Sequence, residues 1–410
     1  MKIITLSSKI ISMKTIGIIA EFNPFHKGHE HIIREAREHF GAESVIVVMS
    51  GDYVQRGEPA VIDKYARTRM ALTAGADIVL ELPVAFATGS AQYFARGAVS
   101  ALLHTGVTDG ILFGSESGEI PGTEAGNRDS SAADDLHTGN FTPMDERLSP
   151  NDLLAAEYIK AIQYFNADIT PLTIPRKAVS HTDDLPKDGF ASASAIRRML
   201  TGASADITDD PSCISAADRS ESIKEFIPSY APDILRAYLA DKKTLSPDRF
   251  SDMLFSSLIR ERSKGFADYF DIFPDLSDKI CGKLEAYKGF TSFIDALKSK
   301  DITYSHLSRA LLHILLNIKK DDVEILRSKY DYCPWLRILG LNRESTLPSI
   351  LRSSAGCSII SRLADAKDVL DADASALLEK DIAASDLYCH AADKKGGFVS
   401  EYRRGIVVIS

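Results

Sequence analysis

The stretch AEFNPFHKGHE, residues 20–30, joins a buried strand expected over residues 16–22 to a helix expected from about residue 29. In an open parallel sheet, ligands bind beyond the carboxyl ends of the strands, and a helix N-terminus at that edge favours a phosphate group. Gly28 lets the backbone approach a phosphate without an intervening Cβ. The stretch therefore predicts a phosphate-binding loop at the end of the first strand.

The two histidines of this stretch are the candidate catalytic residues. His26 and His29 lie three residues apart around the expected helix start, so both imidazoles can face one bound group. They can donate to triphosphate oxygens while the α–β bond breaks, which is an electrostatic task that needs no covalent chemistry. A pair of surface histidines is one alternative. A zinc site is another, but catalytic zinc needs three protein ligands and no third is evident nearby, so no metal site is predicted.

The residues after the loop continue as strands alternating with helices. Short runs rich in β-branched residues predict strands over 16–22, 44–50, 77–83, 110–115 and 169–175. Helices are expected between them over 29–40, 64–74, 87–104, 151–166 and 192–201. This order predicts an α/β domain with a Rossmann-like parallel sheet covered on both faces.

The pattern changes in the second half of the chain. Beyond residue 221 the apolar spacing is helical almost throughout, with strand character only at 336–341 and 405–410. We therefore expect residues 1–12 to be an N-terminal extension and 13–203 to be the ATP-binding domain, with an acidic insert at 118–148. An acidic linker at 204–222 and a mainly helical domain at 223–410 complete the division.

Composition narrows the class of protein. The 410 residues are 45 % hydrophobic and 26 % charged, which is typical of a globular chain rather than a disordered or disulfide-stapled one. Five widely spaced cysteines without a C-x-x-C pair suggest reduced thiols in the cytoplasm. No apolar run approaches the roughly 20 residues of a membrane helix, and no signal peptide is evident. Residues 118–150 and 204–222 carry the whole net charge of −9, so a polyanionic partner is not excluded, and neither acidic stretch should lie on its path.

The order strand, N-P-F turn, H-x-G-H and helix resembles the signature of the HxGH nucleotidyltransferase superfamily. Members of that superfamily carry a second phosphate-contacting element, and ASASAIR at residues 191–197 resembles it. Ser192, Ser194 and Arg197 are therefore candidate phosphate contacts, because hydroxyls at a helix start and a guanidinium one turn on suit phosphate oxygens. The alternative is an ordinary N-capped amphipathic helix.

Further segments resemble the bacterial tRNA(Met) cytidine acetate ligase family, namely residues 48–83, 90–99, 113–117, 149–162 and 334–343. The resemblance implies that acetate and ATP form acetyl-adenylate and pyrophosphate, with Mg²⁺ expected beside ATP. The acetyl group then passes to the exocyclic amine of the wobble cytidine in elongator tRNA(Met). The expected partners are this tRNA, bound by the helical domain at 223–410, and acetate, without a membrane or an obligatory protein partner.

The resemblance also implies a set of ATP-binding residues. They are Gly114, Asn151, Arg176 and the loop formed by Ile19, Ala20, Glu21, Phe22, Asn23, Pro24, Phe25, His26, Lys27, Gly28, His29, Glu30, His31 and Ile32. Outside the loop, a turn glycine, a helix N-cap and a surface arginine are the alternatives. Asp52 and Tyr53 depart from the family pattern, which usually has a neutral polar residue and a phenylalanine.

Four basic residues near the strand ends form the candidate tRNA surface: Arg56, Lys64, Arg67 and Arg69. Positions 64 and 67 share a helical face while 69 turns away, so the four cannot all converge. The alternative is a solvated helix that uses Asp63 and Glu58 as ion-pair partners. Two other functions are also open: an adenylyltransferase acting on a small phosphorylated acceptor, and a module that senses ATP without catalysis.

Overall fold

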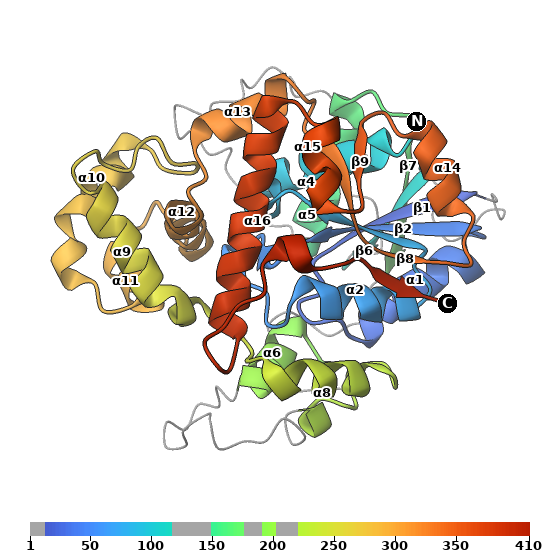
Figure 1. Cartoon of the computed structure of the whole chain (residues 1–410), viewed down its shortest axis with the longest axis horizontal. Coiled ribbons are helices and arrows are strands. Elements are labelled where there is room, and N and C mark those ends of the chain that lie inside the picture. The colour runs from blue at the N-terminus through green and yellow to red at the C-terminus, as the bar shows by residue number, and fades with distance from the viewer. Residues whose placement is uncertain (1–12, 117–148, 176–190, 202–219) are drawn as a thin grey trace.

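A mixed sheet with eight strands forms the centre of this computed structural model, which describes residues 13–116, 149–175, 191–201 and 220–410 (Figure 1). The strand order is β10-β8-β5-β2-β1-β6-β7, and β9 pairs with β8. The strands are β1 (Thr15–Ala20), β2 (Ser44–Ser50), β5 (Ile78–Leu82), β6 (Gly110–Ser115), β7 (Thr170–Pro175), β8 (Trp335–Asn342), β9 (Ser358–Ile360) and β10 (Val407–Ile409). The predicted α/β class is confirmed.

The first five strands of the sheet are parallel. β1 pairs with β2 on one side and with β6 on the other, β2 pairs with β5, and β6 pairs with β7. The chain therefore leaves β1 in one direction along the sheet and later returns to its other side. Ligand sites of open α/β sheets lie at such a reversal of strand order, beyond the carboxyl ends of the strands. β1 ends at this point, immediately before the histidine loop.

Two apolar layers cover the sheet because alternate side chains of each strand point to opposite faces. In β2, Ile46 and Val48 belong to one buried cluster, and Val45, Val47 and Met49 belong to the other. The second cluster is completed by α1 (Lys27–Glu38), α2 (Lys64–Thr73), α6 (Ala193–Thr201) and α8 (Ala231–Asp241). The first is covered by α3 (Val84–Ala87), α4 (Ala91–His104) and α5 (Pro150–Tyr164), together with later helices. Helices therefore pack against both faces of the sheet and fix the positions of the strand ends.

A lobe beside the sheet is formed by α9 (Ser251–Glu261), α10 (Pro274–Gly282), α11 (Phe290–Leu297) and α12 (Tyr304–Leu316), and α16 (Ala372–Ala392) lies between this lobe and the strands (Figure 1). The other later helices are α13 (Lys320–Ser328), α14 (Leu347–Ser354) and α15 (Ala366–Val369), of which α14 and α15 lie on the sheet side of α16. Short 3₁₀ helices occur at Pro247–Phe250 (η2), Leu284–Ala286, Leu363–Asp365 and Glu401–Arg403. A helical C-terminal region is therefore present, as predicted.

The C-terminal region also supplies strands, which the sequence pattern only hinted at. β8 pairs antiparallel with β5, and β10 pairs parallel with β8. The sheet therefore contains strands from before and after the predicted linker at 204–222. Both parts of the chain also contribute side chains to one hydrophobic core. The proposed division at that linker stays a prediction, and most of the linker lies outside the described residues.

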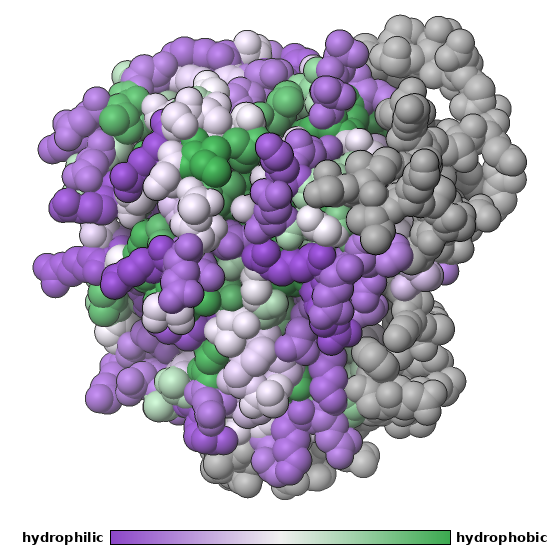
Figure 2. Space-filling model, turned by 90° about the vertical axis from the view of Figure 1, so that its right-hand side faces the viewer, coloured by the Kyte–Doolittle hydropathy of each residue, from purple (hydrophilic) through white to green (hydrophobic). Residues whose placement is uncertain are grey.

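The surface is polar over the side turned to the viewer in Figure 2. Hydrophilic side chains there separate the apolar ones into small areas. In the described part of the chain, no helix is both long and apolar enough to cross a membrane.

Candidate functional site

His26 and His29 lie at the start of α1, directly beyond β1. His26 is the N-cap, and its Nδ1 accepts a hydrogen bond from the Gly28 N–H at 3.1 Å. Nδ1 of His29 accepts from the His26 N–H at 3.2 Å, which closes a capping box. An accepting Nδ1 carries no proton, so each neutral ring carries its proton on Nε2. Both side chains thus have Nε2–H as their donor to a bound group.

The two imidazole rings are held in place by close packing. They stack with their centroids 3.7 Å apart, and Phe22 and Phe25 pack against the His29 ring. A Cβ at residue 28 would lie 2.9 Å from Cε1 of His26. Gly28 is therefore needed for the histidine geometry itself, besides leaving the helix start open to a phosphate.

Asn23 connects the histidine loop to two other segments. Its side-chain Oδ1 accepts from the Val61 N–H at 2.8 Å, and its carbonyl accepts from Arg197 Nη1 at 2.7 Å. Arg197 Nη2 also donates to Ser194 Oγ at 3.1 Å, and Ser192 Oγ accepts from the Ala195 N–H to cap α6. The structure therefore brings Ser194 and Arg197 of α6 next to the loop, and their contact with phosphate stays a prediction.

Glu21 is an acidic residue of the loop that directly follows β1. Its carboxylate accepts from the Gln55 N–H at 2.8 Å. Burial raises the pKa of Glu21, while the Gln55 hydrogen bond and the positive charges of Arg197 and Arg56 act in the opposite direction. Glu21 thus places a buried carboxyl group between two arginines at the end of β1.

Gly114 and Asn151 lie together at the end of β6. Gly114 is the fifth of the six residues of β6, and Asn151 Nδ2 donates to Glu116 Oε1 at 2.7 Å. Asp152 links α5 to the end of β6, because its carboxylate accepts hydrogen bonds from Ser115 Oγ and from the Glu116 N–H. Arg176 lies outside the described residues. The sequence pattern did not indicate the contact of Asp152 with the end of β6.

The predicted tRNA surface needs a correction. Lys64 and Arg67 are fully buried, with exposures of 0 %, so they do not belong to an exposed basic surface. Arg67 donates to the carbonyls of Glu21, Ser50 and Gly51, which end β1 and β2. Only Arg56 and Arg69 of the four predicted residues are exposed. Lys64 and Arg67 can be buried because their charged groups bind acceptors from distant parts of the sequence.

Lys64 belongs to a buried charge cluster. Its Nζ lies 2.7 Å from carboxylate oxygens of Glu81 and Glu401, and Arg337 pairs with the same two carboxylates at 2.8 and 2.5 Å. Asp52 accepts from the Lys64 N–H, and burial raises the pKa of Asp52 to about 6. The cluster joins α2 and β5 to β8 and the C-terminal segment. The cluster was not evident from the sequence because its members lie in distant segments of the chain, from position 52 to position 401.

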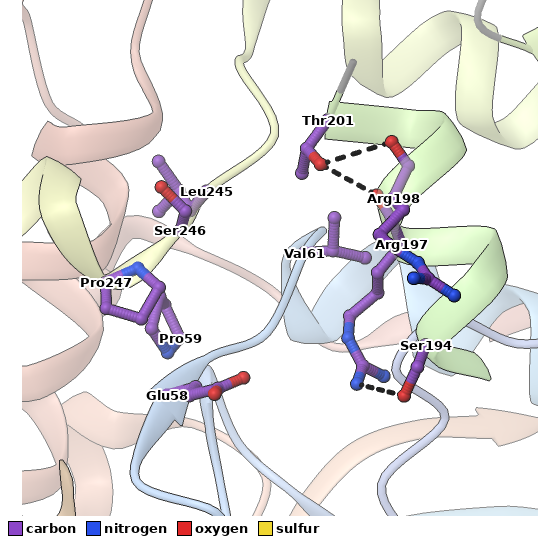
Figure 3. Close-up of a pocket in the computed structure, with 10 residues that line it drawn as sticks. All are labelled: Glu58, Pro59, Val61, Ser194, Arg197, Arg198, Thr201, Leu245, Ser246 and Pro247. Atoms are coloured by element: carbon purple, nitrogen blue, oxygen red, sulfur yellow. Dashed lines mark hydrogen bonds between the residues drawn. The ribbon is translucent and has the colours of Figure 1, made fainter. Parts of the chain in front are cut away.

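A pocket of about 360 Å³ opens beside this site, between α6, β4 (Glu58–Pro59) and η2 (Figure 3). β4 pairs with β3 (Tyr53–Val54) in a small hairpin, and Ser308 of α12 donates to the Gly57 carbonyl of its turn at 2.8 Å. The lining residues are Glu58, Pro59, Val61, Ser194, Arg197, Arg198, Thr201, Leu245, Ser246 and Pro247. Both parts of the chain therefore contribute to its walls, which sequence reasoning did not reveal.

Metal ligands are scarce in the same region. Among residues 13–116, 149–175, 191–201 and 220–410, no group of three His, Cys, Asp or Glu side chains is arranged to hold a metal ion. The backbone N–H groups of residues 26–30 already donate within the protein, so the loop offers a ligand the Nε2–H groups of His26 and His29, which suit anionic oxygens.

Comparison with known proteins agrees with this geometry. The family described as HIGH Nucleotidyl Transferase matches residues 13–128 and 123–399. The tRNA(Met) cytidine acetate ligase of Acetivibrio thermocellus is 30 % identical over 97 % of this chain and all of its own length. That of Clostridium perfringens is 32 % identical over 92 % of this chain and 95 % of its own. The crystal structure of Thermotoga maritima TmcAL bound with alpha-thio ATP superposes with a TM-score of 0.81, at 26 % identity over 97 % of this chain and all of that one.

These matches place the chain in the HIGH nucleotidyl transferase class of proteins. Because full-length relatives reach 30 % identity or more, the chain belongs to the tRNA(Met) cytidine acetate ligase family.

Proposed function

We propose that this chain is an ATP-dependent ligase that activates acetate as acetyl-adenylate and transfers the acetyl group to the wobble cytidine of elongator tRNA(Met). The observation that carries the proposal is the pair of stacked imidazoles with Nε2–H groups at the start of α1, beyond the central strand. The names of the full-length relatives and the ATP-analogue complex of the structural relative support the same reading.

The first step, formation of acetyl-adenylate, increases the negative charge on the phosphates that leave. Acetate oxygen attacks the α-phosphorus of ATP, the bond to the bridging oxygen breaks, and pyrophosphate leaves. The Nε2–H donors of His26 and His29, together with the positive end of the α1 dipole, stabilise the charge that develops on the phosphates without any covalent intermediate on the protein. Mg²⁺ is expected to arrive with ATP, bound largely by phosphate oxygens and water. Arg176, Gly114 and Asn151 remain proposed nucleotide contacts.

The second step joins carbon to nitrogen. The cytidine amine attacks the acetyl carbonyl, AMP leaves, and acetylcytidine is formed in the RNA. Exposed Arg56 and Arg69 remain candidates for RNA phosphate contacts. A reduced, cytoplasmic setting without an obligatory protein partner is part of the same proposal.

Isotope exchange tests the first step alone. Labelled pyrophosphate should enter ATP only when acetate is present, and tRNA should not be needed. His29→Ala should abolish this exchange because it removes one of the two Nε2–H donors. Exchange that proceeds at the same rate without acetate would contradict the proposal and favour an adenylyltransferase for another acceptor.

A further inference from the structure

We propose that the pocket between α6, β4 and η2 receives the cytosine base of the acceptor nucleotide, with Glu58 accepting a hydrogen bond from its exocyclic amine. This inference rests on the proposed function. It assigns the Glu58 side of the pocket to the second step, whereas Ser194 and Arg197 on the opposite wall remain candidate phosphate contacts for ATP.

The pocket combines apolar side chains with one acidic group. Pro59, Val61 and Leu245 are buried residues of its walls, and the Leu245 N–H donates to the Val61 carbonyl at 3.3 Å. Apolar side chains of this kind suit the faces of an unstacked base. A volume of about 360 Å³ lies within the range of small-molecule sites.

Glu58 is the only carboxylate among the lining residues, and its side chain makes no hydrogen bond or close ion pair with any described residue. Its carboxylate faces the Arg197 guanidinium across the pocket in Figure 3. That guanidinium is itself engaged by the Asn23 carbonyl and by Ser194. The Glu58 carboxylate oxygens therefore remain available as acceptors for a ligand.

A carboxylate in this position distinguishes the two pyrimidines. Cytosine presents an amine donor where uracil presents a carbonyl acceptor, and Asp or Glu side chains pair with the cytosine amine. A carboxylate facing the uracil carbonyl would place two acceptors against each other. The pocket thus selects the base that can be acetylated.

The pocket adjoins the nucleotide loop through Asn23. Two residues of its walls, Val61 and Arg197, both bind Asn23, which lies three positions before His26. In the transfer step the amine nitrogen bonds to the acetyl carbon, and the bond from that carbon to the AMP oxygen breaks. AMP leaves with the electron pair, and the proton lost by the nitrogen passes along the hydrogen bond to Glu58.

The decisive variant is Glu58→Gln, which keeps the shape of the side chain but removes its charge and basicity. Acetyl transfer to tRNA should fall by about a hundredfold, while acetate-dependent pyrophosphate exchange should be unchanged. Glu43→Gln is the matched control, because Glu43 is exposed and precedes β2 at the opposite edge of the sheet. It should leave both steps unchanged.

The preference of the protein for one wobble base over another is a measurement that a merely structural role of Glu58 would leave unchanged. The wild-type chain should bind tRNA(Met) with cytidine at the wobble position more tightly than the same tRNA with uridine there. In Glu58→Gln that preference should shrink by about tenfold, because the amide can also donate to the uracil carbonyl. Ser246→Trp, at an exposed pocket residue, should block transfer and leave exchange intact.

Equal losses of exchange and transfer in Glu58→Gln would overturn the assignment and place the pocket in the nucleotide site. An unchanged transfer rate and an unchanged base preference would also overturn it. Failure of the proposed function itself is distinguishable, since the wild-type chain would then show no acetate-dependent exchange.

Discussion

Arg67 and Arg69 show how different two arginines of one helix can be. Arg67 is fully buried, and its guanidinium binds the carbonyls at the ends of β1 and β2, whereas Arg69 is exposed. Helical spacing correctly predicted that positions 64 and 67 share a face and that 69 turns away. It could not predict that the charged face points inward, because the acceptors of Arg67 come from other strands.

Arg67→Met should therefore destabilise the protein by about 3 kcal/mol or more, because several buried carbonyls lose their donor and methionine offers none. Urea unfolding measures the change. Arg69→Met is the matched control, and its free energy of unfolding should stay within about 0.5 kcal/mol of wild type. Equal effects of the two substitutions would contradict the role assigned to Arg67.

The helix α16 has polar side chains on the face that packs against the rest of the protein. Its inward face carries Asp381, Ser385 and Tyr388, at the spacing i, i+4, i+7. They bind the Val84 N–H at 2.9 Å, Lys64 Nζ at 2.7 Å and the Ala60 carbonyl at 2.7 Å. Polar residues on the buried face obscure the apolar stripe that marks an amphipathic helix. By contrast, β1, β2, β5, β6 and β7 were predicted to within about two residues because their apolar runs are nearly continuous.

Asp381 should make stability depend on pH. Burial raises the pKa of Asp381 from 3.8 to about 7, and the nearby Glu81 charge adds to the effect. The folded chain thus holds a proton that the unfolded chain releases, so this group's contribution to stability falls as pH rises from about 4 to 7. Asp381→Asn should raise the free energy of unfolding by roughly 2 kcal/mol at pH 8 and by little near pH 4.

Urea unfolding at several pH values measures this difference. Asp368→Asn, at an exposed aspartate, is the control and should show no such trend. A lower stability of Asp381→Asn at pH 8 would show that the ionised carboxylate is needed in place, contrary to this account.

At the scale of the whole molecule, one sheet unites the two parts of the chain. β8 lies beside β5 although more than 250 residues separate them, and Arg337 of β8 meets Lys64 of α2 through Glu81 and Glu401. Local patterns predicted the class of the first half and its histidine loop, since both are encoded within short segments. The pocket and the charge cluster are long-range products of folding, so no local pattern revealed them.

The central claim is that acetate is activated by ATP at the histidine loop and then passed to RNA. It is tested most directly by incubating the chain with radiolabelled acetate, ATP labelled at the α-phosphate, and elongator tRNA(Met). The account predicts that the acetate label enters the tRNA, only when ATP is present, and that the phosphate label is recovered as free AMP. Phosphate label attached to a small acceptor, with no acetate label in the RNA, would contradict it.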